Sequence, residues 1–205
     1  MGTGGAKTAE DFRWDLGDLL QGDRALAQTS QRLQGKTVAL LISGGIAAFR
    51  TPALVRELRR AGAEVHTFAT PAALQFVTRD ALEWTSLHPL IAGLDGRAQH
   101  VESSADAYLL APATYSTINK LAVGIADNAV TTTLASALGH LEAGRAQVLL
   151  APTMHGSMAH AVLRESLARL ANLGCVVIPP LGRDGKALLP DDATLVDAVA
   201  RSLGR

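Results

Sequence analysis

The chain has few cysteines, no net charge and no long apolar run, and each of these absences excludes a class of protein. It contains one cysteine in 205 residues, which excludes an intramolecular disulfide framework and a cysteine-rich metal site and fits a reducing compartment. Nineteen basic residues balance nineteen acidic ones, so the formal charge of zero provides no overall attraction to nucleic acid or to an anionic membrane. No apolar run reaches the ~18 residues of a membrane span, and residues 1–12 lack the apolar core of a signal peptide. These absences predict a cytoplasmic protein that binds neither nucleic acid nor a membrane.

The composition and the patterning of the chain are those of a single α/β domain. Apolar residues make up 48% and charged residues 19%, which is enough to build a sizeable core. Apolar runs typical of buried strands alternate with helical patterns, and these runs cover residues 37–42, 64–68, 107–111, 147–151 and 175–178. This alternation predicts a Rossmann-like domain, with a parallel sheet and helices on both faces. Leucines at helical spacing over residues 10–33 predict an N-terminal helical extension, so we divide the chain into residues 1–34 and residues 35–205.

Unusual residues follow several of the predicted strands, at the edge of a parallel sheet where ligands bind. The first strand ends in residues 43–48 (SGGIAA), where glycines let an anion approach and a helix start offers free amide hydrogens. This turn has the position and composition of a phosphate site, although a tight turn without a ligand would read the same. It matches neither the G-x-G-x-x-G fingerprint nor a P-loop. After the second strand, Thr70 stands where a dinucleotide site would place a carboxylate, which favours a mononucleotide over NAD.

Two further strand ends carry hydroxyl groups, methionines and a histidine. Residues 112–117 (PATYST) place hydroxyl side chains at a helix start, where we expect helix capping and ligand contact together. Residues 152–158 (PTMHGSM) contain two of the three methionines, whose side chains adapt to flat polarizable surfaces and equally well fill a core. The remaining histidines show no metal-ligand spacing, so we predict no metal site from His66, His88, His140 and His160.

These motifs, in this order, resemble the FMN-binding flavoprotein family of homo-oligomeric cysteine decarboxylases. That family includes phosphopantothenoylcysteine decarboxylase and the lantibiotic peptidyl-cysteine decarboxylases. Residues 43–50 are similar to the family's Gly-Gly-Ile-Ala-Ala-Tyr-Lys turn, and residues 70–76 match its Thr-x5-Phe element. Residues 112–117 are similar to Pro-Ala-Ser-Ala-Asn-Thr, residues 120–127 to Lys-Leu-Ala-x-Gly-Ile-Ala-Asp, and residues 152–158 to Pro-x-Met-Asn-x-x-Met.

The resemblance, which covers the chain from about Gly35 onward, implies bound FMN and a homotrimer or a multiple of a trimer. It implies a substrate, either a small molecule or a peptide, that carries a cysteinyl carboxylate. His100 is then the general base, and His155 binds the substrate carboxylate where the family has an asparagine. The implied FMN contacts come from Ser43, Gly44, Gly45, Ile46, Ala47, Thr70, Phe76, Pro112, Ala113, Thr114, Thr117, Lys120 and Met154.

The residues that depart from the family pattern stand at positions that the resemblance assigns to catalysis and substrate binding. Ser116 and His155 each replace an asparagine, and the spacing from His100 to the third strand end is two residues shorter than usual. The flap loop, residues 180–186, lacks the cysteine that donates a proton in the coenzyme A enzymes, and Cys175 falls earlier, in an expected strand. An oxidative decarboxylation whose product remains an ene-thiol needs no such donor. We therefore predict an FMN-dependent oxidative decarboxylase. Two alternatives stay open: an FMN-dependent reductase of a pterin or quinone, and a non-catalytic flavin-binding regulatory subunit.

Overall fold

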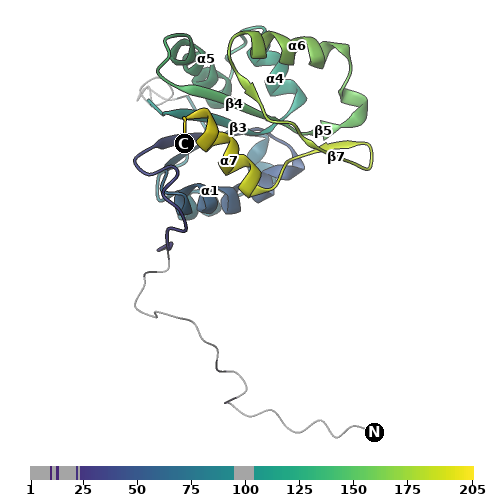
Figure 1. Ribbon diagram of the computed structural model, residues 1–205. Helices are drawn as coiled ribbons and strands as arrows, with labels where there is room; N and C mark the ends of the chain where they lie inside the picture. Colours follow the sequence, from purple (N-terminus) through teal and green to yellow (C-terminus); the bar gives the residue numbers. More distant parts are fainter. Residues whose placement is uncertain (1–9, 11–12, 14–21, 23, 95–103) are drawn as a thin grey trace, which may run out of the picture.

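A five-stranded parallel sheet forms the centre of the protein, in the strand order β2-β1-β3-β4-β6 (Figure 1). The computed structural model describes residues 10, 13, 22, 24–94 and 104–205. The predicted parallel α/β architecture is confirmed, with strand bounds close to those expected. The strands are β1 (Thr37–Ile42), β2 (Glu64–Ala69), β3 (Ala107–Ala113), β4 (Gln147–Pro152) and β6 (Val176–Val177).

Helices cover both faces of this sheet (Figure 1). Successive side chains of a strand point to opposite faces, so Val38 and Leu40 of β1 enter one core while Ala39 and Leu41 enter the other. The first core is closed by α1 (Thr51–Arg60), α2 (Arg79–Ser86) and α7 (Asp192–Ser202). The second is closed by α4 (Tyr115–Ala122), α5 (Ala129–Glu142) and α6 (Ala161–Asn172). None of the helices in the described part of the chain is both long and apolar enough to cross a bilayer.

A second, small antiparallel sheet follows directly from the end of β4. It contains β5 (Met154–His155), β8 (Lys186–Leu188) and β7 (Leu181–Arg183), in the order β5-β8-β7. Asp184 and Gly185 join β7 to β8 with φ angles of 51° and 68°, the left-handed pair of a two-residue hairpin turn. The segment expected as a flap loop, residues 180–186, is therefore a hairpin, and the Asp-Gly dipeptide is the sequence signal for it.

The chain before β1 does not form the predicted helix where it is described. Residues 24–33 consist of turns and irregular structure, and most of the remaining predicted helix lies outside the described residues. The Leu33 side chain is completely buried in the core beside α1, and its amide donates to the Ala61 carbonyl oxygen at 2.8 Å. The Thr29 amide donates to the Arg60 carbonyl oxygen at 3.0 Å. The amides of this segment thus pair with carbonyl oxygens at the end of α1 rather than with one another in a helix. The domain boundary at residue 34 stays a prediction.

Candidate functional site

A pocket of about 440 Å³ opens at the carboxyl ends of β1, β3 and β4. The strand order reverses at this point, because the chain runs outward from β1 to β2 and then returns to β3 on the other side of β1. Ligands bind at such switch points in open parallel sheets. The pocket contains six of the residues selected from the sequence. Its lining is Gly44, Gly45, Ile46, Thr114, Tyr115, Ser116, Thr153, Met154, His155, Met158, Lys186, Ala187 and Leu188.

Ser43 joins the two loops that form the floor of this pocket. Its side chain is completely buried. The Ser43 hydroxyl donates to the Pro112 carbonyl oxygen at 2.6 Å and accepts the Thr114 amide hydrogen at 2.9 Å. Both hydrogen bonds reach across from β1 to the end of β3. The structure therefore uses the Ser43 hydroxyl to hold the β1 turn against the start of α4, and Ser43 does not itself line the pocket.

Two glycines set how closely the β1 turn approaches its neighbours. A Cβ atom on Gly44 would lie 2.4 Å from the Ala72 Cβ atom, and one on Gly45 would lie 3.2 Å from the Thr114 Cγ2 atom. Gly45 is also the N-cap of the 3-10 helix Ile46–Arg50, which continues directly into α1. It has no side chain to occupy the first helical amides, and such amides are the usual donors to an anion. The turn thus has the form predicted for a phosphate site.

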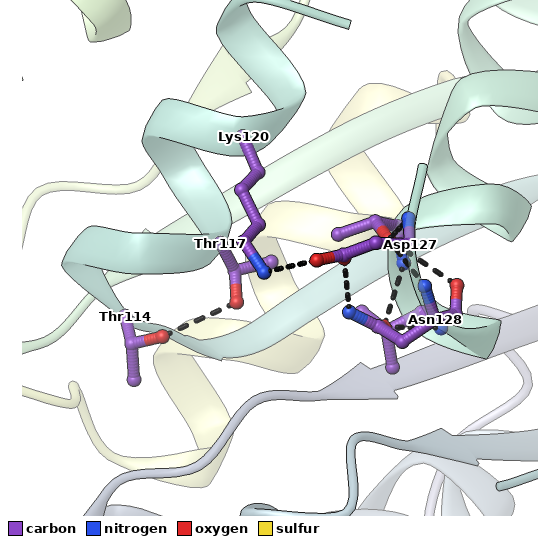
Figure 2. Close-up of polar contacts among 7 residues, drawn as sticks. Thr114, Thr117, Lys120, Asp127 and Asn128 are labelled. Atoms are coloured by element: carbon purple, nitrogen blue, oxygen red, sulfur yellow. Dashed lines mark hydrogen bonds and ion pairs between the residues drawn. The ribbon is translucent and has the colours of Figure 1, made fainter. Parts of the chain in front are cut away.

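The start of α4 brings a hydroxyl group to the pocket. Thr114 is the N-cap residue, but its side chain makes no capping hydrogen bond, so the cap expected there did not form. The Thr114 Oγ1 atom lies 3.2 Å from Thr117 Oγ1 instead (Figure 2). Figure 2 also shows Lys120 turned toward Asp127. The Asp127 carboxylate accepts hydrogen bonds from the Lys120 ammonium group and from the Asn128 side-chain amide, and the first of these bonds lowers the pKa of Asp127. Thr117 and Lys120 therefore support the site from outside its lining.

Five more residues selected from the sequence lie behind the pocket wall or beside it. Thr70 is buried and its Oγ1 accepts the Ala73 amide hydrogen at 3.1 Å, so it closes the turn after β2. Phe76, at the end of that turn, is 40% exposed. Ala47, Pro112 and Ala113 are buried within the fold. Each of the five belongs to a strand end or turn that shapes the pocket, although none of them lines it.

His155 lies at the mouth of the pocket, on β5. Its Nδ1 atom accepts the Ser157 amide hydrogen at 3.2 Å and lies 2.8 Å from the Ser157 hydroxyl oxygen. With Nδ1 accepting this hydrogen bond, the Nε2 atom carries the ring proton, so His155 offers an Nε2–H donor to the pocket. His100 lies outside the described residues.

The β7–β8 hairpin supplies a wall of the pocket that the sequence analysis did not identify. Lys186 and Ala187 of β8 pair with His155 and Met154 of β5, and the Gly156 amide donates to the Gly185 carbonyl oxygen at 2.8 Å. These contacts bring the flap segment onto the methionine motif. The Asp-Gly turn was the available signal for the hairpin, but its pairing with β5 is a tertiary contact.

Arg50 secures the far end of the same hairpin. Its guanidinium group donates to the carbonyl oxygens of Leu189 and Pro190, each at 2.9 Å, and to the Asp192 carboxylate at 3.0 Å. Burial raises the pKa of Asp192, although the neighbouring Arg50 charge opposes that shift. Arg50 thus ties the end of the flap to the start of α1.

Cys175 is a core residue, as predicted. Its side chain is buried in the core beside α4, α5 and α6. Burial raises the pKa of the Cys175 thiol to about 11, so it stays protonated near neutral pH. This thiol lies outside the pocket lining and does not replace the cysteine that is missing from the flap.

Comparison with known proteins identifies relatives along most of the chain. The family model described as Flavoprotein matches residues 26–204, starting earlier than the Gly35 expected from the motifs. The Coenzyme A biosynthesis bifunctional protein CoaBC of Thermococcus kodakarensis is 36% identical over 184 residues, which cover 86% of this chain and 44% of that protein. CoaBC of Methanocaldococcus jannaschii is 30% identical over 177 residues, covering 85% of this chain and 43% of the relative. The chain thus spans less than half the length of these curated relatives.

Solved structures similar to this chain include FMN-dependent cysteine decarboxylases. The FMN-dependent cysteine decarboxylase TvaF from thioviridamide biosynthesis is 29% identical, with a TM-score of 0.68 and coverage of 83% of this chain and 99% of TvaF. The FMN-dependent cysteine decarboxylase SpaF is 21% identical, with a TM-score of 0.72 and coverage of 84% of this chain and 99% of SpaF. The SpaF similarity supports the fold, because its sequence identity is low.

Proposed function

The chain belongs to the Flavoprotein family, and on that premise we propose that it is an FMN-dependent decarboxylase of a cysteinyl carboxylate. The observation that carries the proposal is the single pocket that joins the glycine turn, the start of α4, the methionine motif and the flap hairpin. The relatives support it, since TvaF is an FMN-dependent cysteine decarboxylase and CoaBC acts in coenzyme A biosynthesis. The substrate is either a small molecule or a peptide with a cysteinyl carboxylate.

The residues present fit an FMN molecule. The pocket lining offers the backbone of Gly44 and Gly45 and the Thr114 hydroxyl, which suit a phosphate group. It also includes Met154 and Met158, whose thioethers pack well against an aromatic ring. The volume of about 440 Å³ lies within the usual range for small-molecule sites. We therefore assign these residues to hold the cofactor.

The chain's own residues bind and orient the substrate in this mechanism. Bound FMN would supply a two-electron acceptor for oxidation at the thiol end of the substrate, which makes loss of carbon dioxide easy. The His155 Nε2–H donates a hydrogen bond to the substrate carboxylate, and the Lys186 ammonium group across the β5–β8 pair adds a positive charge. Strand β8 of the hairpin forms one wall of the pocket beside these groups. His100, outside the described residues, stays a prediction as the general base.

The decisive experiment combines a spectrum with a turnover assay. The purified protein should show the flavin absorption bands and release FMN rather than FAD on denaturation. Incubation with phosphopantothenoylcysteine or with a peptide ending in cysteine should release carbon dioxide and transiently bleach the flavin. Flavin bleaching by a reduced nicotinamide that is reversed by an oxidised pterin or quinone, without carbon dioxide release, would favour the reductase. Bound FMN with neither reaction would favour the regulatory subunit, and a colourless protein that takes up no FMN would refute the cofactor assignment.

The substitution His155→Asn tests the carboxylate contact. An asparagine side-chain amide can donate a hydrogen bond in place of the His155 Nε2–H, so FMN binding and turnover of a cysteinyl peptide should be kept or improved. His155→Ala removes the donor and should raise KM about tenfold, corresponding to ~1.4 kcal/mol of lost binding. His140→Asn is the matched control, because His140 lies outside the pocket lining and its ring stacks on Tyr108. Equal activity of His155→Ala and the unaltered protein would remove His155 from substrate binding.

We further propose a cytoplasmic homotrimer, or a multiple of a trimer, with neighbouring subunits meeting at the pocket. Ile46 and Met158 line the pocket yet remain 70% and 46% exposed, and the adjacent Phe49 is 60% exposed. Apolar side chains gathered at a functional site are typical of surfaces that another chain covers. Light scattering at micromolar concentration should give three times the chain mass or a multiple of it. A flavin-bound monomer would contradict this proposal, and Phe49→Glu should shift the assembly toward monomer.

A further inference from the structure

Two histidines and a glutamate meet at the edge of the central sheet, away from the pocket. Glu64 and His66 lie two residues apart on the edge strand β2, so their side chains leave the same face. The His66 Nε2 atom lies 3.1 Å from the Glu64 Oε1 atom, and the His88 Nε2 atom lies 3.5 Å from the same oxygen. The two imidazole ring centres are 4.3 Å apart. One potential ligand atom from each side chain therefore falls within 4.8 Å of the others.

The cluster stands on backbone that the fold holds in place. Glu64 and His66 are in register with Thr37 and Ala39 of β1. His88 follows α2, whose last turn closes with Leu87 in the left-handed conformation at a φ of 67°. The buried Ser86 hydroxyl donates to the His88 carbonyl oxygen at 3.0 Å and accepts the His88 amide hydrogen at 3.2 Å. A metal ion at this place would therefore meet ligands that need little ordering.

We propose that Glu64, His66 and His88 form a binding site for a divalent transition-metal ion of the zinc class. Imidazole together with one carboxylate suits zinc, copper or nickel, whereas magnesium and calcium prefer oxygen ligands alone. A tetrahedral zinc ion with bonds of ~2.0–2.1 Å places its ligand atoms about 3.3 Å apart. The Glu64–His66 and Glu64–His88 distances already bracket that value. Three protein ligands leave the fourth position for water.

The charges around the cluster allow a cation to bind, with moderate affinity. Glu64 supplies a negative charge, and all three side chains are partly exposed, at 56% for Glu64, 31% for His66 and 33% for His88. Arg59 also faces His88 and opposes a cation, although its guanidinium group is engaged with the Thr85 carbonyl oxygen at 2.7 Å.

The site is independent of the proposed flavin pocket. Glu64 begins β2, whereas the pocket lies at the opposite, carboxyl ends of the neighbouring strands. The absence of metal-ligand spacing in the sequence does not argue against it, because the fold brings His88 to the β2 edge from a different element. The proposal therefore stands or falls separately from the decarboxylase activity.

Calorimetric titration of zinc chloride into the untagged, full-length protein tests the site. We expect one zinc ion per chain at neutral pH, with affinity falling as the pH drops, because protons compete with the metal for the imidazole nitrogens. His66→Ala and His88→Ala should each weaken binding at least tenfold, since even the loss of an outer-shell partner has that effect. His140→Ala, in a histidine that stacks on Tyr108 outside the cluster, is the matched control.

Two readouts decide the outcome. Cobalt(II) bound in place of zinc should give the strong visible absorption of a tetrahedral site, and His88→Ala should abolish it. FMN content and circular dichroism of each variant should match those of the unaltered protein, which separates loss of metal from loss of fold. Zinc binding that is absent from the unaltered protein, or that is equally strong in His66→Ala and His88→Ala, would overturn the proposal.

Discussion

The substitution Gly44→Ala should abolish stoichiometric FMN binding, lowering FMN affinity tenfold to a hundredfold. The added Cβ atom would lie 2.4 Å from the Ala72 Cβ atom and 2.8 Å from the Ala72 carbonyl carbon. Because part of this contact is with backbone, the β1 turn and the turn that begins at Thr70 must move apart. Overpacking of this kind costs typically ~1–3 kcal/mol, and the β1 turn is the one assigned to the cofactor phosphate. Each 1.4 kcal/mol lost from binding is about a tenfold change in affinity.

Fluorescence titration of the apoprotein with FMN measures this effect, since a bound flavin changes its emission. The matched control is Gly139→Ala, because a Cβ atom there meets nothing within 4 Å. Gly139 lies inside α5, so alanine should leave FMN affinity unchanged and stabilise the fold by ~0.5–1 kcal/mol. Thermal unfolding of both variants shows whether Gly44→Ala remains folded. A folded Gly44→Ala protein with unchanged FMN affinity would remove the glycine turn from the cofactor site.

Gly156→Ala should leave FMN in place and reduce kcat/KM for a cysteinyl substrate about a hundredfold. A Cβ atom on Gly156 would lie 2.4 Å from the Gly185 carbonyl oxygen, the same atom that accepts the Gly156 amide hydrogen. The substitution therefore pushes the hairpin turn away from β5 and shifts Lys186 relative to His155. A displacement of ~1 Å at substrate-positioning groups can reduce turnover a hundredfold.

Steady-state kinetics with a peptide ending in cysteine, together with the FMN content of each preparation, tests this expectation. Gly182→Ala is the matched control within the same hairpin, because a Cβ atom there meets nothing within 4 Å and β7 forms the outer strand. It should retain kcat/KM within about twofold, an allowance of ~0.4 kcal/mol. If Gly156→Ala turns over as fast as Gly182→Ala, the contact between hairpin and β5 has no part in catalysis.

One error in the sequence interpretation shows the limit of periodicity as evidence. Leucines at helical spacing led to a helix over residues 10–33, yet the described residues 24–33 are irregular. Among the described residues 24–33, Leu33 is the one buried in the core, and the amides near it pair with the carbonyl oxygens at the end of α1. A buried position such as that of Leu33 is occupied by an apolar residue whether the backbone around it is helical or extended. Burial of an apolar side chain is favourable in either backbone conformation, so the leucine spacing did not establish a helix.

The parallel sheet, the helices on both of its faces and the glycine turn of the pocket could be predicted from the sequence. Each of these features is indicated by residues that are adjacent in the chain. Continuous apolar runs mark strands buried on both sides, and parallel strands bring their following residues to one edge. The flap wall of the pocket, the Arg50 contacts and the Glu64–His66–His88 cluster depended on tertiary structure. Arg50 reaches Leu189 across 139 positions of sequence, and His88 reaches Glu64 from another element. Local sequence patterns do not indicate contacts between residues that are so far apart in the chain. The packing of whole helices and strands decides which of these side chains meet.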